Sequence, residues 1–493
     1  MSKRVRFGVL VCLGIAGATS AHAQPARQPP ASTAVDLSLQ EAIARAAGRS
    51  EEVELARAAV ESAETQITAA RSAGLPQLNA TTSYARTFVS PFTRGLEFRL
   101  PDEDRFNPDP TAPLEERVTY LEQNADSAVL TTLADILTTS LQGVGLGSPH
   151  AYTANLSGSQ VLYSGGRISA ALGIATAARD AARFTYEEEV AEAELAVRTA
   201  YYRALLAREL ESIAQAALVQ AESFLNQERL RLEAGFASDL DVMRAEVALE
   251  NLRPELVQAR NALELAMLDL KRLVNLPLSQ PIRLTTPLEI PTGAPPVTRV
   301  DMNELLEKRA ALQAARRQVA AGEYGVRAAR AEYLPAVSLQ VAYGGQTFPQ
   351  SLFGFGDARW QPNGSATVAV QIPLFSGFQR GANVGQARVE LRRAELQEAQ
   401  LREAVQLQYE QALGERERAR ATISARQRTV DQAQRVYDLT VLRYEQGQAT
   451  QLEITDARLA LLEARTNLAQ ALTDFHIADA GVNRAMGVTT VSR

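Results

Sequence analysis

The chain has 493 residues, of which 46% are hydrophobic and 22% are charged, so it is neither disordered nor an ordinary bundle of membrane-spanning helices. Its 57 acidic residues outnumber its 51 basic ones, and this negative balance disfavours nucleic acid as a partner. The single cysteine, Cys12, leaves no disulfide framework and no thiolate metal site in the rest of the chain.

The first 23 residues have the pattern of a secretory signal peptide. A basic start is followed by an apolar run at 7–19 and by the small-x-small sequence Ala21-His22-Ala23. A membrane anchor is the alternative, but the run is shorter than the roughly 20 residues that a spanning helix needs. We expect the mature chain to begin at Gln24. Removal of three basic residues leaves 48 basic against 57 acidic, a net charge of −9.

The chain repeats itself. QVLYSGGR (160–167) recurs as IPLFSGFQR (372–380), and RLEAGFASDLDVMRAEVAL (231–249) recurs as RYEQGQATQLEITDARLAL (443–461). Equivalent residues of both pairs, such as Ser164 and Ser376, are 212 positions apart. A third pair, 74–84 and 333–343, is offset by 259, so the first copy has 47 extra residues within 89–150. One structural unit therefore occurs twice.

Each copy reads as helix, strand, strand, long helix, helix. The first repeat, 24–276, is expected to contain a helix at 37–73, a strand at 76–88, a long external loop at 89–150, a strand at 151–164, and helices at 167–233 and 238–275. The second repeat, 301–487, is expected to contain a helix at 303–332, a strand at 335–344, a loop at 345–363, a strand at 364–376, and helices at 380–446 and 450–486. The six prolines of 277–300 mark an extended linker, and 488–493 is a short tail.

The predicted strands have one apolar and one polar face. Val337, Leu339 and Val341 alternate with Ser338 and Gln340, a period of two. Four strands cannot stand alone in lipid, since the unpaired backbone groups at their edges each cost several kcal/mol. A trimer supplies twelve strands and a dimer eight, and the strand pattern alone leaves both open. The alternative is a secreted periplasmic coiled-coil spacer with a small sheet and no pore.

The long predicted helices have an apolar stripe at nearly heptad spacing, which indicates helices packed side by side. In the second copy this stripe is made by Val384, Ala387, Leu391, Ala394, Leu401, Val405 and Ala412. The two shorter helices of that copy together hold 67 residues, and so does the long one at 380–446. Two short helices stacked end to end would match one long partner, which suits the wall of a tube.

The duplicated layout resembles the TolC-type outer-membrane efflux protein (outer-membrane factor) family. The resemblance rests on the aromatic-Ser-Gly strand ends at 163–165 and 375–377 and on the paired turns Gly235-x-x-Ser238-x-x-Asp241 and Gly447-x-x-Thr450-x-x-Glu453. It covers about 37–487. It implies an α+β membrane protein that is a homotrimer, with a 12-stranded transmembrane β-barrel, four strands per chain, continued into a 12-helix periplasmic α-barrel.

The resemblance also implies a location and a function. The chain would be a passive exit duct in the outer membrane, in contact with outer-membrane lipid. It would work with a periplasmic adaptor (membrane fusion) protein and an inner-membrane transporter, in efflux or in type I secretion. The two turns would form the periplasmic tips that dock the adaptor. Their residues are Gly235, Phe236, Ser238, Asp241, Gly447, Gln448 and Thr450.

The family narrows its tunnel with acidic residues just past the second turn. The matching positions are Glu453 and Asp456, which are helical neighbours and would place six carboxylates around the axis of a trimer. Arg244 stands where Asp456 stands in the other copy and would pair with an acid across the interface. Tyr444 matches a family tyrosine that latches the closed state. The simpler interpretation of the charges is a solvated helix face.

No enzyme site is visible in the sequence. None of the three histidines, His22, His150 and His476, has a metal-ligand neighbour at the usual spacing, and no phosphate-binding loop appears. We therefore expect no catalytic residue, no metal and no cofactor. The segment 89–150 is expected outside the cell as a solvated surface loop, with a helix-like apolar pattern at 114–142.

Overall fold

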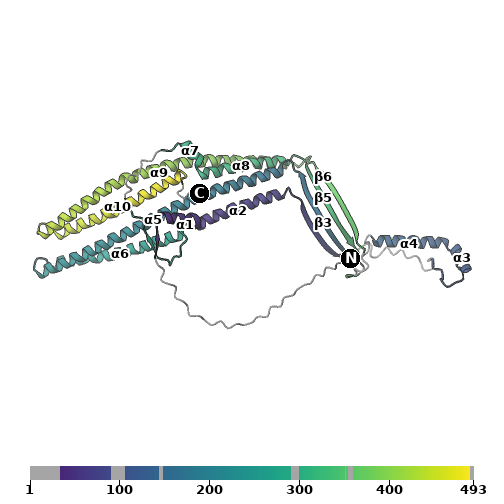
Figure 1. The fold of residues 1–493 in the computed structure, drawn as a ribbon, viewed down its shortest axis with the longest axis horizontal. Helices are drawn as coiled ribbons and strands as arrows, with labels where there is room; N and C mark the ends of the chain where they lie inside the picture. Colours follow the sequence, from purple (N-terminus) through teal and green to yellow (C-terminus); the bar gives the residue numbers. More distant parts are fainter. Residues whose placement is uncertain are drawn as a thin grey trace, which may run out of the picture.

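The computed structural model describes residues 34–89, 106–143, 148–289, 299–349, 351–353 and 359–488. The signal peptide expected at 1–23 and residues 489–493 of the tail lie outside these ranges. Figure 1 shows an elongated molecule in which a sheet of four strands lies at one end of a set of long helices. None of the described helices combines the length and apolar character needed to cross a membrane.

The sheet has the strand order β2-β3-β5-β6, and all neighbouring strands are antiparallel. The strands are β2 (Gln77–Arg86), β3 (His150–Tyr163), β5 (Ala336–Thr347) and β6 (Gln361–Gln371). The outer edges of β2 and β6 pair with nothing in the described part of this one chain.

Four of the longer helices attach to the same end of the sheet (Figure 1). In chain order they are α2 (Glu51–Ser72), α5 (Arg167–Glu233), α8 (Ala310–Ala331) and α9 (Gln379–Glu445). α5 and α9 each have 67 residues, which at 1.5 Å per residue is about 100 Å. Each turns back into a helix of 35 residues, α6 (Asp239–Leu273) after α5 and α10 (Gln451–Ala485) after α9.

The expected strand at 364–376 was placed too late. β6 begins at Gln361 and ends at Gln371, ahead of Pro373, whose nitrogen has no hydrogen to donate to a ladder. β5 runs three residues past the expected end at 344, because Gly344 and Gly345 belong to the strand rather than to a turn. A Cβ at Gly344 would collide with Asn155 of β3, so glycine allows the close approach of the two strands.

The expected helices at 37–73 and 303–332 are each broken. The first consists of β1 (Val35–Leu37), α1 (Leu39–Arg49) and α2. The two helices are separated at Ser50, which has an extended backbone. Its side chain caps α2 by accepting a hydrogen bond from the Val53 amide. The second is α7 (Met302–Lys308) and α8, separated by Arg309 at φ −69° and ψ 114°. Both breaks lie midway along the long helices (Figure 1).

The proline-rich linker is not wholly an extended connector. It contains β4 (Ile282–Leu284), which pairs in parallel with β1. The external segment has two helices, α3 (Leu114–Gln123) and α4 (Ala125–Gly143), which confirm the helix-like pattern expected at 114–142 and interrupt the loop expected at 89–150. They lie beyond the end of the sheet that faces away from the long helices (Figure 1).

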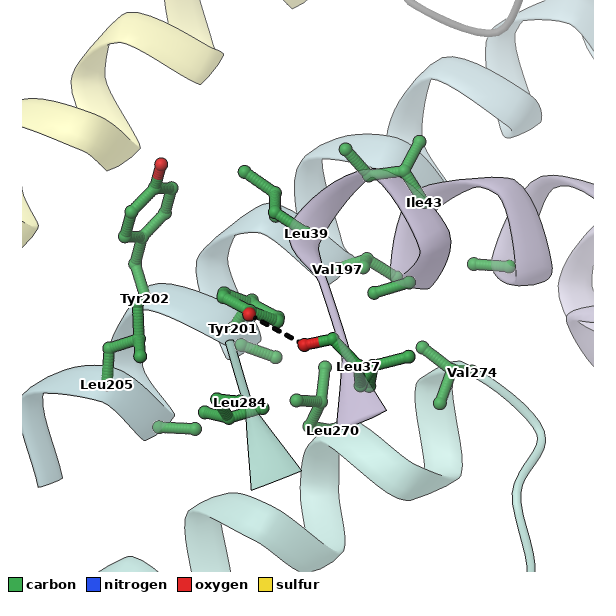
Figure 2. Packing of buried hydrophobic residues seen from close by; sticks show 14 residues of the cluster. Leu37, Leu39, Ile43, Val197, Tyr201, Tyr202, Leu205, Leu270, Val274 and Leu284 are labelled. Carbon is green, nitrogen blue, oxygen red and sulfur yellow. Dashed lines mark hydrogen bonds between the residues drawn. The ribbon is translucent and has the colours of Figure 1, made fainter. Parts of the chain in front are cut away.

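The largest apolar core lies where the small β1–β4 pair meets α1, α5 and α6 (Figure 2). Leu37, Ile43, Val197 and Leu270 are fully or almost fully buried there. The Tyr201 hydroxyl donates to the Leu37 carbonyl at 2.9 Å and accepts from the Thr286 amide at 3.2 Å. One buried hydroxyl therefore fixes both strands on α5.

Candidate functional site

Two helical turns form the end of the molecule that is farthest from the sheet (Figure 1). Gly235 and Gly447 have φ of 79° and 72°, a left-handed conformation that glycine adopts without strain. In each turn the amide of the next residue donates five positions back, from Phe236 to Arg231 at 2.7 Å and from Gln448 to Arg443 at 2.8 Å. These bonds satisfy helix-end carbonyls, so the two hairpins end in the same geometry.

The helices that follow both turns begin with a reciprocal cap. The Ser238 side chain accepts from the Asp241 amide, and Asp241 accepts in return from the Ser238 amide at 3.0 Å. Thr450 and Glu453 repeat this arrangement, with 2.6 Å from the Thr450 amide to the Glu453 carboxylate. These hydrogen bonds hold the pKa of Asp241 and of Glu453 below the usual range, so both are ionised at neutral pH.

The predicted gate residue Tyr444 joins the two hairpins. Its hydroxyl donates to the carboxylate of Glu228 on α5 at 2.9 Å, and Glu228 is fully buried. Burial and this carboxylate raise the pKa of Tyr444, so the hydroxyl remains a donor at physiological pH. The guanidinium of Arg231 lies 4.6 Å from the Tyr444 ring centre and 3.9 Å from the Glu228 carboxylate.

Glu228 was not foreseen from the sequence, although a signal for it exists. Ala217, Ala221 and Leu225 are buried on one stripe of α5, and Glu228 takes the next position on that stripe. A carboxylate at an apolar seam position needs a buried partner. Comparison of the two repeats does not reveal this position, because the residue equivalent to Glu228, 212 positions later, is Thr440.

A second contact joins the tips close to the turns. Gln451, the first residue of α10, donates through Nε2 to the Asp241 carbonyl at 2.8 Å. Gln451 is 7% exposed, and its side-chain oxygen has no partner within the described residues. Sequence analysis missed this contact as well. Near the tips, two hydrogen bonds among the described residues thus hold the α5–α6 hairpin to the α9–α10 hairpin.

A cavity of about 180 Å³ separates the hairpins next to the Tyr444–Glu228 bond. Phe224, Glu228, Tyr444 and Arg458 contribute to its walls. One carboxylate oxygen of Glu228 is buried without a hydrogen-bond partner in the described residues. Burial lowers the pKa of Arg458. The contact between the hairpins is therefore polar and imperfectly packed, unlike the apolar cores nearer the middle of the helices.

The remaining predicted residues differ in their surroundings. Phe236 is 78% exposed at the end of the first hairpin, and Asp456 is exposed on α10 beyond the cap. Arg244 is exposed on α6 and forms no ion pair inside the described part of this single chain. Glu453 is occupied by its cap, so of the two predicted constriction acids Asp456 is the one free of a local hydrogen bond within the described residues.

The histidines that sequence analysis considered have ordinary partners. His150 Nδ1 lies 2.9 Å from the Tyr84 hydroxyl at the end of the sheet. His476 stacks on Tyr202 with ring centres 4.3 Å apart, and its Nε2 lies 3.2 Å from the Glu289 carbonyl. Across the ranges that the structure describes, no three side chains of the metal-binding types gather into a cluster.

Known proteins were compared with this arrangement of sheet, helices and tips. The family model described as "Outer membrane efflux protein" matches residues 118–276 and 302–488, which is more than half of the chain. The chain belongs to the outer membrane efflux protein family. The family recognised from the paired turns is thereby confirmed, and this outer membrane efflux protein is an outer-membrane protein.

Individual relatives agree with this assignment. Protein CyaE of Bordetella pertussis is 30% identical over 312 residues, 62% of this chain and 64% of its own length. Alkaline protease secretion protein AprF of Pseudomonas aeruginosa is 27% identical over 335 residues, 64% of this chain and 65% of its own length. The chain thus matches less than two thirds of the length of these relatives.

The fold has a counterpart among solved structures. The outer membrane protein VceC from Vibrio cholerae superposes with a TM-score of 0.67, covering 91% of this chain and 96% of that one at 19% identity. At this identity the likeness concerns the fold alone. The efflux protein described here accordingly has the α+β, mainly helical architecture of outer-membrane channels.

Proposed function

We propose that the chain is one third of a homotrimeric, passive exit duct that carries substrates across the outer membrane. The observation that carries the proposal is the four-stranded sheet with two faces of opposite character and two unpaired edges.

The register of the sheet separates apolar from polar side chains. Leu339 lies opposite Val368 and Val337 opposite Val370, whereas Ser338 lies opposite Ala369 and Gln340 opposite Thr367. Because opposite residues of antiparallel strands share a face, one face is apolar and the other is mostly polar. Val368 and Val370 are 61% and 60% exposed in the single chain. In a barrel, the apolar face of the sheet would contact lipid and the polar face would line a water-filled lumen.

The edges of β2 and β6 require partners in a membrane. Unpaired backbone groups there would each cost several kcal/mol in hydrocarbon. Three copies joined edge to edge would give a closed barrel of twelve strands. A dimer would give eight, which is the lower limit of bacterial barrels. The trimer is favoured by the family to which the chain belongs.

The helices support the same assembly. Each half of the chain supplies one helix of 67 residues and one of 35, and we infer from the matching lengths and repeated motifs that the halves arose by duplication. The two long helices and the two pairs of shorter helices stacked end to end make four helical columns per chain. Three chains would then form a tube of twelve columns below the barrel.

The tips would serve as gate and docking surface. Tyr444 and Glu228 would hold the two hairpins of one protomer together in the closed state, and Asp456 would line the entrance. Arg244 is exposed and would pair with an acid from a neighbouring protomer. The exposed Phe236 and the turn residues around it would contact a periplasmic adaptor protein, which would connect the duct to an inner-membrane transporter.

Two kinds of cargo are compatible with the comparisons. The family description names efflux, and the name of AprF refers to secretion of a protease. The duct has no proposed chemistry of its own, so the partner transporter would supply the energy and most of the selectivity. Type I secretion is therefore the second candidate to small-molecule efflux.

Purification and electrical recording test the proposal. The mature protein should remain in outer membranes after urea washing, should be a trimer in detergent by native mass spectrometry, and should produce discrete conductance steps in planar bilayers. A monomer that is soluble without detergent, or a trimer that conducts no ions in any recording, would refute the duct.

A further inference from the structure

An arm of two helices, α3 and α4, projects beyond the sheet and is not needed for the proposed duct (Figure 1). Asn124 separates the helices at φ −122° and ψ 22°. The aromatic rings of Phe106 and Tyr120 are 5.6 Å apart, and the Phe106 amide donates to Thr131 Oγ1 at 3.1 Å. These contacts tie the entry of the arm to both of its helices, so the arm has local structure.

Both helices of the arm expose an apolar stripe. In α4, Val129, Leu133 and Ile136 follow steps of four and three, and their side chains are 67%, 52% and 57% exposed. In α3, Leu114, Val118 and Leu121 follow the same steps and are 75%, 47% and 50% exposed. Beyond α3, no described helix or strand packs extensively against α4. Six large apolar side chains at helical spacing in water mark a surface that another element covers.

The charge of the arm argues against lipid as the surface that covers its apolar stripes. Residues 114–143 contain five acidic side chains and one basic side chain, Arg117. Helices that lie on a membrane surface are rich in lysine and arginine on their polar face, which attracts anionic headgroups. α4 has no basic residue at all. The surrounding anionic leaflet would repel this arm, whereas an apolar protein surface would not.

The covalent connection of the arm points to its partner. Only six residues lie between Gly143 and His150, where β3 begins, and six residues span at most about 20 Å. Three copies of the sheet joined edge to edge would hold three arms at one end of one barrel. Tethering at this range gives the arms an effective concentration on the order of millimolar, so that even a short apolar stripe can associate with its copies.

We propose that the apolar stripe of α4 packs against the same stripe of the neighbouring protomers, forming a collar of parallel helices at the outer mouth of the duct. Symmetry brings identical residues to the same height, so Val129 meets Val129 and Leu133 meets Leu133 around the axis. This is the arrangement of a/d positions in a parallel coiled coil. The collar rests on the proposed trimer, and it adds a contact between protomers outside the barrel and the helical tube.

Cysteine cross-linking in the full-length protein tests the collar. The only native cysteine is Cys12 in the expected signal peptide, so Val129→Cys introduces a single thiol into the mature chain. Ser127→Cys is the matched control, on the same helix but on the face opposite the apolar stripe. A disulfide requires Cα atoms within about 7 Å. With mild oxidant in outer membranes, Val129→Cys should link two protomers of each trimer, and Ser127→Cys should link few or none.

The outcomes separate the collar from the trimer. Native mass spectrometry of the same samples reports the oligomer, so a monomer or dimer would refute the trimer and the collar with it. A trimer in which Val129→Cys does not cross-link, or cross-links no better than Ser127→Cys, would refute the collar alone. A nitroxide at residue 129 that is open to oxygen and shielded from a nickel chelate in vesicles would place the stripe in lipid, which also refutes the collar.

Discussion

The Tyr444 hydroxyl and the Glu228 carboxylate form a 2.9 Å hydrogen bond between α9 and α5, with the carboxylate fully buried. The contact is costly to lose, because a buried carboxylate without its donor retains the full penalty of leaving water. The adjacent cavity and the second, unpartnered carboxylate oxygen of Glu228 leave room for the hairpins to shift. A strong hydrogen bond in a poorly packed region is consistent with two hairpins that separate in a single step when this bond breaks.

We expect Tyr444→Phe to favour the open state of the tips. Loss of this hydrogen bond leaves the buried Glu228 carboxylate with only the 3.9 Å contact to Arg231 among the described residues, and should cost the closed arrangement about 1–3 kcal/mol. Single-channel recordings should show higher mean conductance or longer open times than the parent protein. Tyr437→Phe is the matched control, since Tyr437 lines the same cavity and its hydroxyl has no hydrogen-bond partner in the described residues. Equal conductance of the two variants would argue against a latch at Tyr444.

Asp456 is the better candidate for cation selectivity at the entrance. Glu453 is bound to the Thr450 amide at 2.6 Å, whereas Asp456 is exposed and carries no such hydrogen bond within the described residues. Asp456→Asn would remove three charges from a trimer and should lower the ratio of cation to anion permeability, measured as a reversal potential in a salt gradient. Asp474→Asn, 18 residues farther along α10, should leave the ratio unchanged. A reversal potential unaffected by Asp456→Asn would remove Asp456 from the constriction.

The sequence indicated the long helices because their signals are local. Gly235 and Gly447 each precede a capping residue by three positions, and the apolar stripe before them has no proline. The break at Ser50 was missed although its cap on the Val53 amide is local, and the break at Arg309 was missed for a different reason. Arg309 is 2% exposed and pairs with Glu188 of α5 at 2.8 Å, a contact 121 residues away in sequence. Long-range ion pairs of this kind leave no periodic pattern in the chain.

The candidate site was predictable to a similar extent. Each turn and its cap depend on residues of one short motif, Gly235 to Asp241 and Gly447 to Glu453, so the spacing was sufficient to find them. Glu228 and Gln451 act through partners 216 and 210 residues away. The pairing of β1 with β4 also joins distant segments, 247 residues apart at Asp36 and Arg283. Three-residue strands are too short to show an alternation.

Phe236 should matter for coupling and not for folding. It is 78% exposed at the tip and buries almost nothing within its own chain, so Phe236→Ala should leave the thermal midpoint within the error of measurement. In cells that contain the cognate transporter, the same variant should reduce export of the substrate. Phe353→Ala is the control, because Phe353 is 80% exposed near the opposite end of the sheet. Normal export with Phe236→Ala would exclude this side chain from adaptor docking.

Stability should fall as the pH drops below about 6.5, through His476. Burial against Tyr202 lowers its pKa from the ordinary 6.5, so the unfolded chain binds this proton more tightly than the folded one. The folded protein therefore favours the neutral His476 ring. The contribution of this ring to the free energy of unfolding is complete above pH 6.5, and it is lost as the pH falls toward the lower pKa of the folded state. Between about pH 7.5 and about pH 5.5, the thermal midpoint should decline less in His476→Gln than in the parent protein. Ordinary carboxyl groups titrate below this pH range and do not contribute to the difference. Equal slopes for both proteins would assign the pH dependence elsewhere.

The strongest single effect on stability should come from the Tyr201 hydroxyl. It is fully buried, donates to the Leu37 carbonyl (Figure 2) and accepts from the Thr286 amide. Tyr201→Phe keeps the ring in its apolar surroundings and leaves the Thr286 amide without this partner, at about 1–3 kcal/mol for a buried group, whereas the Leu37 carbonyl still accepts from the Thr285 amide at 3.2 Å. The neighbouring Tyr202 is 7% exposed, and its hydroxyl has no hydrogen-bond partner in the described residues, so Tyr202→Phe should be nearly neutral. Thermal unfolding in detergent compares the two, and hydrogen exchange at 35–37 and 282–284 should accelerate in Tyr201→Phe alone. Similar exchange in both variants would mean that the β1–β4 pair is held by the surrounding leucines and not by this hydroxyl.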